Sequence, residues 1–247
     1  MNVVGLISGG KDSIYNLVCC FKDGHNITAL AHLIPYKSQN ETDSFMYQSV
    51  GFELIPSISE CMEKPLIQHQ IKRKPINLEM NYVYDSNDEV EDLYELLLEV
   101  KTKFPNINAV SCGAIKSNYQ KKRLEHVCER LNLQILAYLW ERDQKELLQN
   151  MINDGIDAIL VKIAAYGLKK EHIGKSIKEM YTYLEEMSNK YGLNICGEGG
   201  EYETCTLDCL LFKKKIVIDE YEVIQHTHDS ICPVFIFKPL KWKIHPK

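Results

Sequence analysis

Six consecutive residues near the start of the chain carry groups that can hold a phosphate. They read Ser8-Gly9-Gly10-Lys11-Asp12-Ser13 and lie where an apolar run gives way to a helical pattern. Adjacent glycines let a turn bring bare backbone N–H groups against an anion, and the N-terminus of the following helix adds donors. The serine hydroxyls donate further hydrogen bonds, Lys11 adds positive charge, and Asp12 can help to hold Mg²⁺. We expect this segment to bind the phosphates of a nucleotide.

A Walker loop is the competing interpretation of the same segment. The spacing Gly5-x-x-x-x-Gly10-Lys11 fits, but the next residue should be Ser or Thr for Mg²⁺ and is Asp12. Gly5 also lies inside the expected strand, so the turn begins only at Ser8. Both points count against a Walker loop.

The elements that must position this loop alternate between strand and helix in the first half of the chain. Short apolar runs predict strands at residues 3–7, 27–33, 107–112 and 133–136. Apolar positions at helical spacing predict helices at residues 13–21, 89–103 and 117–131. Strands separated by such helices indicate right-handed crossovers. We therefore predict an α/β fold with a doubly wound parallel sheet, formed by residues 1–138.

Beyond that point the pattern becomes that of a second, smaller α+β domain, formed by residues 139–247. Helices are expected at residues 144–153 and 172–189, and strands at residues 158–163, 210–212, 215–218 and 234–238. Residues 60–87 are irregular and interrupted by prolines, which suggests an insertion with hairpin character.

Composition and charge limit the class of protein. The net charge of −5 disfavours broad nucleic-acid binding, because that affinity comes from many Lys and Arg contacts with phosphates. No apolar run approaches the roughly 18 residues that a membrane span needs, so no membrane association is expected. The nine cysteines include no Cys-x-x-Cys pair, which gives no signal of a zinc ribbon or a dithiol redox motif. Reduced thiols and a cytoplasmic location are expected.

The six-residue loop resembles the signature of the N-type ATP pyrophosphatases, a group with a HUP-like fold that includes NAD and GMP synthetases. The resemblance implies that ATP is the nucleotide and that the loop holds its β and γ phosphates. The α-phosphorus is then open to attack by a carboxylate or carbonyl oxygen, and ATP is split into AMP and pyrophosphate.

Further segments resemble a narrower family, the diphthine–ammonia ligases. These segments are Glu198-Gly199-Gly200-Glu201-Tyr202-Glu203-Thr204 after Cys196-Gly197, residues 43–48, residues 113–120 with Arg123, and residues 139–144. Leu210 stands where the family usually has proline, and residues 60–87 match the family poorly. The resemblance implies amidation of diphthine, a modified histidine of translation elongation factor 2, with free ammonium and through an acyl-adenylate.

The resemblance also implies where the nucleotide lies. Six residues that follow or end two strands should approach adenine and ribose: Ala31, His32, Leu33, Gly113, Ala114 and Ile115. His32 is equally well interpreted as a histidine that merely ends a strand, and residues 113–115 as a plain turn between a strand and a helix. Lys11 and Asp12 are the expected catalytic residues at the phosphates, and Asp12 is the expected Mg²⁺ ligand.

Three acids among glycines form the candidate acceptor site. Glycines break both helices and strands, so Glu198, Glu201 and Glu203 do not fit a core or a helix face. They could bind the trimethylammonium group of diphthine, orient ammonium or hold a second Mg²⁺, with Glu201 and Glu203 taking part in catalysis. Tyr47 or Tyr202 could offer an aromatic face to the quaternary amine. The alternative is an acidic surface loop.

The sequence leaves two alternatives for the role of each of two basic side chains, and it leaves two alternative functions for the chain. Arg123 either reaches a phosphate or lies on a solvated helix face, and Lys162 either faces the site from a strand end or extends to solvent from the sheet edge. One rival is a tRNA-modifying enzyme of the same loop group, although the chain lacks the paired cysteines and basic surface of such enzymes. The other is a module that binds ATP without turnover.

Overall fold

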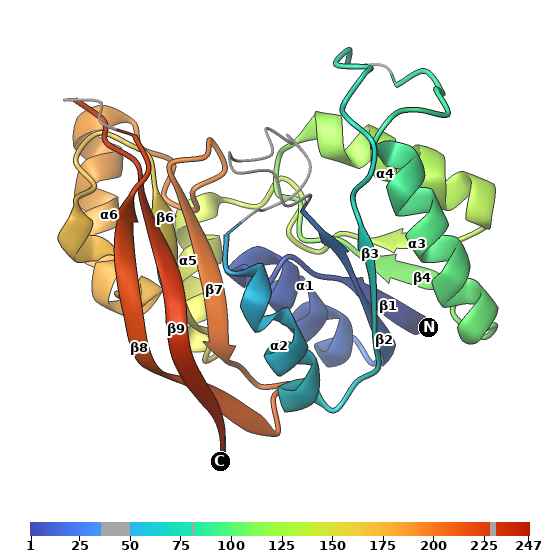
Figure 1. Cartoon of the computed structure of the whole chain (residues 1–247), viewed down its shortest axis with the longest axis horizontal. Helices are drawn as coiled ribbons and strands as arrows, with labels where there is room; N and C mark the ends of the chain where they lie inside the picture. Colours follow the sequence, from blue (N-terminus) through green and yellow to red (C-terminus); the bar gives the residue numbers. More distant parts are fainter. Residues whose placement is uncertain (36–49, 81, 228–230) are drawn as a thin grey trace. The chain divides into compact units, whose positions relative to one another are not determined.

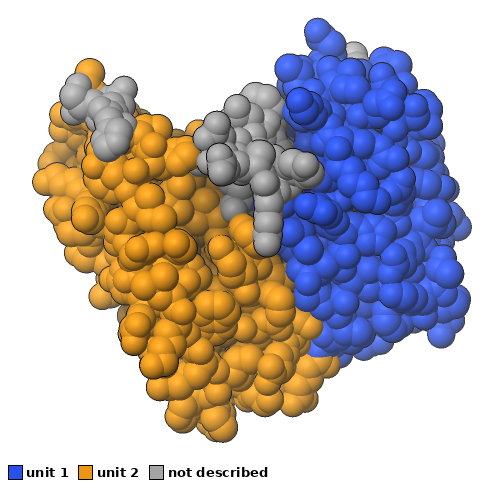
Figure 2. Space-filling view, viewed as in Figure 1, with its two compact units in different colours: residues 1–8, 12–49, 64–140 blue, residues 9–11, 50–63, 141–247 orange. Residues whose placement is uncertain are grey.

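The computed structural model describes residues 1–35, 50–80, 82–227 and 231–247, in two compact units that Figure 2 colours separately. The described residues of the first unit fall within Met1–Ser8, Asp12–Ser49 and Lys64–Trp140. Those of the second fall within Gly9–Lys11, Val50–Glu63 and Glu141–Lys247. The chain therefore passes from one unit to the other inside the predicted phosphate loop.

The first unit is built on a five-stranded parallel sheet with the order β3-β2-β1-β4-β5 (Figure 1). Its strands are β1 (Asn2–Leu6), β2 (Asn26–Ile34), β3 (Leu66–Gln70), β4 (Ala109–Ser111) and β5 (Gln134–Leu136). Its helices are α1 (Lys11–Lys22, whose first residue belongs to the second unit), α3 (Val90–Lys103) and α4 (Asn118–Leu131). Each strand and helix that the sequence predicts in residues 1–138 begins and ends within two residues of the observed bounds. The predicted α/β fold with a parallel sheet is confirmed.

Successive residues of β1 face opposite layers, because side chains alternate along a strand. Val4 packs in a buried cluster with Leu93 of α3 and Val127 of α4. Its neighbour Val3 packs instead with Cys20 of α1. Helices therefore cover both faces of the sheet, as the doubly wound arrangement requires.

The second unit contains a four-stranded antiparallel sheet with the order β7-β6-β9-β8. Its strands are β6 (Asp157–Ile163), β7 (Tyr202–Asp208), β8 (Lys214–Gln225) and β9 (Phe235–Pro246). Its helices are α2 (Ile55–Met62), α5 (Gln144–Asn153) and α6 (Ile177–Tyr191), with short 3₁₀ turns η1 (Phe52–Leu54) and η2 (Lys170–His172). Of the helices that the structure describes, none has the length and apolar character needed to cross a membrane.

Side-chain caps fix where several helices begin. The hydroxyl of Ser117 accepts the backbone N–H of Gln120 at the start of α4, over 3.3 Å. At the start of α6, Ser176 and Glu179 form a capping box in which each side chain accepts the backbone N–H of the other residue. Such caps satisfy donors that have no partner within the helix.

Three predictions about local structure are wrong. Residues 210–212 form a turn and not a strand, and the N–H of Phe212 donates to the carbonyl of Cys209. The described part of residues 60–87 holds no hairpin: it contains the end of α2, the parallel strand β3 and a loop. The helix expected from residue 172 begins at Ile177, because Gly174 has a left-handed φ of 83° and the capping box follows it.

Candidate active site

The two ends of the phosphate loop contact each other in the first unit. The backbone N–H of Ser8 donates to the hydroxyl of Ser13 over 3.3 Å, and the two hydroxyl oxygens lie 3.4 Å apart. This hydrogen bond joins the end of β1 to the first turn of α1. The loop predicted from its sequence thus lies at the carboxyl end of a parallel strand, where ligands of such sheets bind.

Gly9 needs to be glycine for two reasons. Its φ of 88° lies in the left-handed region, and a Cβ atom there would lie 3.0 Å from the Cδ1 atom of Ile55. Its carbonyl accepts the backbone N–H of Thr206 on β7 over 2.8 Å. The backbone of the loop at Gly9 is therefore fixed by its left-handed conformation, by the nearby side chain of Ile55 and by the hydrogen bond from β7.

Lys11 is held by β7 and by the segment before it. Its backbone N–H donates to the hydroxyl of Thr204 over 3.0 Å, and its ammonium donates to the carbonyl of Cys196 over 2.5 Å. The ammonium also lies 5.1 Å from the centre of the Tyr202 ring. With 2% of its surface exposed, Lys11 is a buried cation that has a carbonyl dipole and an aromatic face among its neighbours.

The turn after β4 packs directly against the first turn of α1. A Cβ atom on Gly113 would lie 2.5 Å from the backbone nitrogen of Ser13 and 2.6 Å from the carbonyl carbon of Asp12. Only glycine lets these two backbones approach so closely. Ala114 and Ile115 are buried beside it. The structure thus brings the turn at residues 113–115 to the phosphate loop.

The side chains expected near adenine at the end of β2 are buried. Ala31 and Leu33 belong to the apolar cluster beneath α3 and α4, and the carbonyl of Ala31 accepts the backbone N–H of Ile7 over 2.9 Å. His32 lies on the opposite face. Its Nδ1 atom is 2.9 Å from the carbonyl oxygen of Ile7, and its Nε2 atom is buried with no hydrogen-bond partner among the residues that the structure describes.

The environment of His32 fixes its protonation. Burial lowers its pKa below the usual value, which favours the neutral ring. A carbonyl oxygen accepts only, so Nδ1 carries the hydrogen and donates it to Ile7. Nε2 is then a buried acceptor at the carboxyl end of β2.

Glu201 holds the acidic glycine-rich segment, residues 196–204, in its turn by accepting two backbone hydrogen bonds. The two carboxylate oxygens of Glu201 accept the backbone N–H groups of Asn194, over 3.0 Å, and of Gly199, over 2.8 Å. Gly197 and Gly200 have left-handed φ values of 77° and 83°. The glycines and Glu201 therefore make a tight turn that leads into β7.

Tyr202 and Glu203 are the first residues of β7 proper. Tyr202 is buried, and its hydroxyl donates to the carbonyl of Ile195 over 2.6 Å. Glu203 pairs with Lys162, its register partner on β6, over an N–O distance of 3.3 Å. Lys162 thus points toward Glu203 of the candidate acceptor segment and does not extend to solvent. Glu198 is partly exposed in the turn.

Arg123 does not lie on a solvated helix face, which corrects that interpretation of it. The side chain is fully buried in the first unit. It donates to the carbonyls of Asn77, over 2.5 Å, and of Glu79, over 3.1 Å, and its guanidinium lies 3.2 Å from the centre of the Tyr119 ring. Tyr47 and the segment 43–48 lie outside the described residues.

No group of three or more His, Cys, Asp or Glu side chains suited to a metal occurs among the residues that the structure describes. Mg²⁺ does not need such a group, since it commonly binds one or two carboxylates together with substrate phosphates and water. Asp12, a hard oxygen ligand in the turn that follows the glycines, fits that donor set.

Sequence reasoning missed the supporting role of β7. Thr204 and Thr206 hold the loop from nearly two hundred residues further along the chain. The segment Tyr202–Asp208 alternates in burial and contains β-branched threonines, which is a strand signal. The neighbouring acids and glycines drew the interpretation toward a turn.

Comparison with known proteins gives the family. A model described as the diphthamide synthase N-terminal domain matches residues 1–135, and one described as the C-terminal domain matches residues 143–237. Proteins named diphthine–ammonia ligase are similar throughout. The one from Danio rerio is 53% identical over 95% of this chain and 92% of its own length, and the one from Homo sapiens is 49% identical over 100% and 94%.

A fungal relative is longer. The diphthine–ammonia ligase of Schizosaccharomyces pombe is 49% identical over 94% of this chain, which spans 38% of that protein. Both domain models are matched in order and together cover most of the residues. The chain therefore belongs to the diphthamide synthase family.

Proposed function

We propose that this chain is a ligase that joins ammonia to the carboxyl group of diphthine on translation elongation factor 2, with cleavage of ATP to AMP and pyrophosphate. The observation that carries the proposal is the similarity, over nearly the whole chain, to proteins named diphthine–ammonia ligase. These relatives favour neither a tRNA-modifying enzyme nor a module without turnover. A translation factor as acceptor implies a cytoplasmic location.

Residues 1–138 are proposed to bind ATP. Residues Ser8-Gly9-Gly10-Lys11-Asp12-Ser13 hold the β and γ phosphates through N–H groups, hydroxyls and the Lys11 charge. Backbone groups of Ala31 and Leu33, with the Nε2 acceptor of His32, face adenine, while residues 113–115 approach the ribose. The burial of Lys11 under Tyr202 supports a role for β7 in setting the position of that charge.

Asp12 is the residue proposed to hold Mg²⁺ together with the phosphates. The ion would neutralise charge on the departing pyrophosphate. Asp12 itself orients the ion and occupies the first turn of α1, where a negative side chain is favoured by the helix dipole.

Residues 139–247 are proposed to serve the acceptor. Glu201 and Tyr202 support the turn that leads into β7 through internal hydrogen bonds. Glu198 and Glu203, the second of which pairs with Lys162, are proposed to meet ammonium and the quaternary amine of diphthine, with Tyr47 as the aromatic face. Orientation of two reactants in this way contributes strongly to rate.

The proposed reaction has two steps. An oxygen of the diphthine carboxylate attacks the α-phosphorus, the bond to the bridging oxygen breaks, and pyrophosphate leaves with its electron pair. Ammonia then attacks the acyl carbon, AMP leaves with the electrons of the acyl–oxygen bond, and the nitrogen loses one proton to solvent to give the amide.

The test is an assay with elongation factor 2 that carries diphthine. With ATP, Mg²⁺ and ammonium present, mass spectrometry of the factor should detect conversion of the carboxylate into an amide, and chromatography should detect AMP and pyrophosphate. Omission of ammonium or ATP should abolish the amide. Turnover that responds to tRNA and not to elongation factor 2 would support the tRNA-modifying enzyme, and ATP binding without any turnover would support the module.

A further inference from the structure

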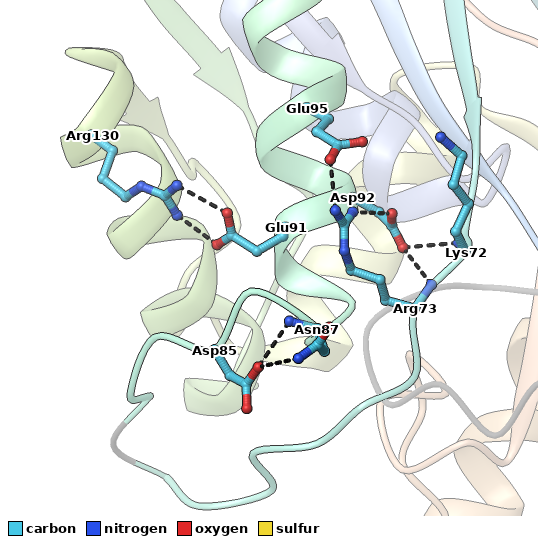
Figure 3. Close-up of polar contacts among 8 residues, drawn as sticks. All are labelled: Lys72, Arg73, Asp85, Asn87, Glu91, Asp92, Glu95 and Arg130. Atoms are coloured by element: carbon cyan, nitrogen blue, oxygen red, sulfur yellow. Dashed lines mark hydrogen bonds and ion pairs between the residues drawn. The ribbon is translucent and has the colours of Figure 1, made fainter.

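The loop between β3 and α3, which the structure describes at residues 71–80 and 82–89, has a backbone held by buried charges. Figure 3 shows the first part of this network. One oxygen of Asp92 accepts the backbone N–H groups of both Lys72 and Arg73, each over 2.9 Å. Its other oxygen takes the guanidinium of Arg73 at 2.6 Å, and that guanidinium also reaches Glu95. Asp92 is 1% exposed, so this carboxylate is committed to the loop.

A second buried carboxylate repeats the pattern one helical turn earlier. One oxygen of Asp88 accepts the backbone N–H groups of Ile76 and Asn77, each over 2.9 Å. Its other oxygen accepts the N–H of Val90 at the start of α3. The two acids lie four residues apart, and so do the two peptide pairs that they bind. The backbone N–H groups of the loop are therefore held at two places, residues 72–73 and residues 76–77.

Helix α4 holds backbone carbonyl groups of the same loop. The buried guanidinium of Arg123 donates to the carbonyls of Asn77 and Glu79. Further along, the ring of Tyr82 contacts the ring of His126, with centroids 5.0 Å apart, and the ring of Tyr84 lies 5.3 Å from the guanidinium of Arg130. In Figure 3, Arg130 is in turn held by Glu91 of α3.

The same loop exposes large apolar side chains. Five of them are between 50% and 68% exposed: Ile76, Leu78, Met80, Val83 and Tyr84. Fixing a backbone costs about 1–2 kcal/mol per residue, and exposed apolar side chains contribute little to offset that cost. Buried charges are also expensive to desolvate. A loop held this firmly, with its apolar groups in solvent, is preorganised for contact with another surface.

The position of the loop identifies the partner. It leaves the carboxyl end of β3, and the carboxyl ends of β1 and β4 in the same parallel sheet lead to Ser8 and Gly113. Ligands of such sheets bind at this edge. We propose that the described residues of this loop, 71–80 and 82–89, dock the protein that carries the reacting carboxylate. Exposed Lys72 and Lys74 beside the apolar groups favour a partner face that is apolar with acidic groups at its rim.

This inference rests on the proposed function, and a kinetic comparison tests it. The variant Ile76→Ser/Leu78→Ser/Met80→Ser removes three exposed apolar groups and leaves the buried anchors intact. The matched control, Phe21→Ser/Leu98→Ser/Leu240→Ser, removes similarly exposed groups elsewhere. Amidation is measured with elongation factor 2 and with a short peptide that carries diphthine. The loop variant should raise the KM for the whole factor by about tenfold or more and leave kcat and the peptide reaction unchanged, whereas the control should match the wild type.

Two results would overturn the inference. The first is a KM for the whole factor that is the same in the loop variant and the wild type. The second is a wild-type dimer that the loop variant dissociates in analytical ultracentrifugation, because the loop would then serve a second copy of the chain. Failure of the wild type to amidate either acceptor would instead overturn the proposed function, and the docking inference with it.

Discussion

At the scale of single residues, the hydroxyl of Thr204 and the backbone N–H of Lys11 form a hydrogen bond that fixes the middle of the phosphate loop. Both groups are buried, so the N–H has no water to replace the threonine. The ammonium of the same lysine is separately held by the carbonyl of Cys196. The position of the Lys11 ammonium therefore depends on residues that lie far away in the sequence.

Replacement of this hydroxyl should impair turnover. In Thr204→Val the N–H of Lys11 loses its acceptor, which costs about 1–3 kcal/mol for a buried donor. If that cost falls on the transition state, AMP formation drops by about 5- to 160-fold. Thr204→Ser retains the hydroxyl and should keep most of the rate. A valine variant with the wild-type rate would show that the bond does not position the loop.

The cysteines should divide into two groups by reactivity. Burial raises the pKa of Cys20 and Cys61 to about 11 and that of Cys128, Cys205 and Cys209 to about 12. The reactive form is the thiolate, so these thiols should resist a maleimide at pH 7 until the protein unfolds. The partly exposed Cys19, Cys112 and Cys232 should react first. Mass spectrometry of the labelled peptides decides the order, and early labelling of Cys205 would contradict this packing.

At the scale of elements, the parts predicted best are those with local causes. Residues 117–131 and 144–153 were readable as helices because apolar spacing and caps coincide, and the caps are seen at Ser117 and Asp143. The strand at residues 210–212 was wrong because a short apolar run also suits a turn in which one side chain, that of Phe212, is buried. β3 was missed because its pairing with β2 depends on register between distant segments, which residues 60–87 do not encode locally.

The contact between the turn after β4 and the start of α1 gives a prediction at this scale. Gly113→Ala places a Cβ atom within 2.7 Å of three backbone atoms of Asp12 and Ser13, which no side-chain rotation can relieve. Overpacking of this kind costs about 1–3 kcal/mol or more. The Tm and the rate of AMP formation should both fall.

Gly24→Ala is the matched control in the same unit. Gly24 has a left-handed φ of 80° and no atom within 4 Å of a built Cβ. Its replacement carries conformational strain of about 1–2 kcal/mol but no clash, and it should leave the rate of AMP formation unchanged. Equal losses in the two variants would show that the close approach at Gly113 does not matter to the loop.

At the scale of the whole molecule, the sequence was sufficient to predict the fold class and the family. It was not sufficient to predict which residues of the acidic segment support its turn. The phosphate loop was predicted from six adjacent residues, and the structure places it at the carboxyl end of β1. The assignment of Glu201 and Tyr202 to the acceptor did not foresee their internal hydrogen bonds. Those bonds depend on a turn whose shape is set by glycine conformations and by Asn194, which no spacing reveals.

The central claim is that the acceptor carboxylate attacks the α-phosphorus of ATP. The direct test uses diphthine whose carboxylate carries isotopically labelled oxygen, on elongation factor 2, with ATP, Mg²⁺ and ammonium. Attack at the α-phosphorus transfers one labelled oxygen to AMP when the amide forms, and mass spectrometry of the nucleotide should find it there, with unlabelled pyrophosphate. Label in orthophosphate, with ADP as the nucleotide product, would contradict the account.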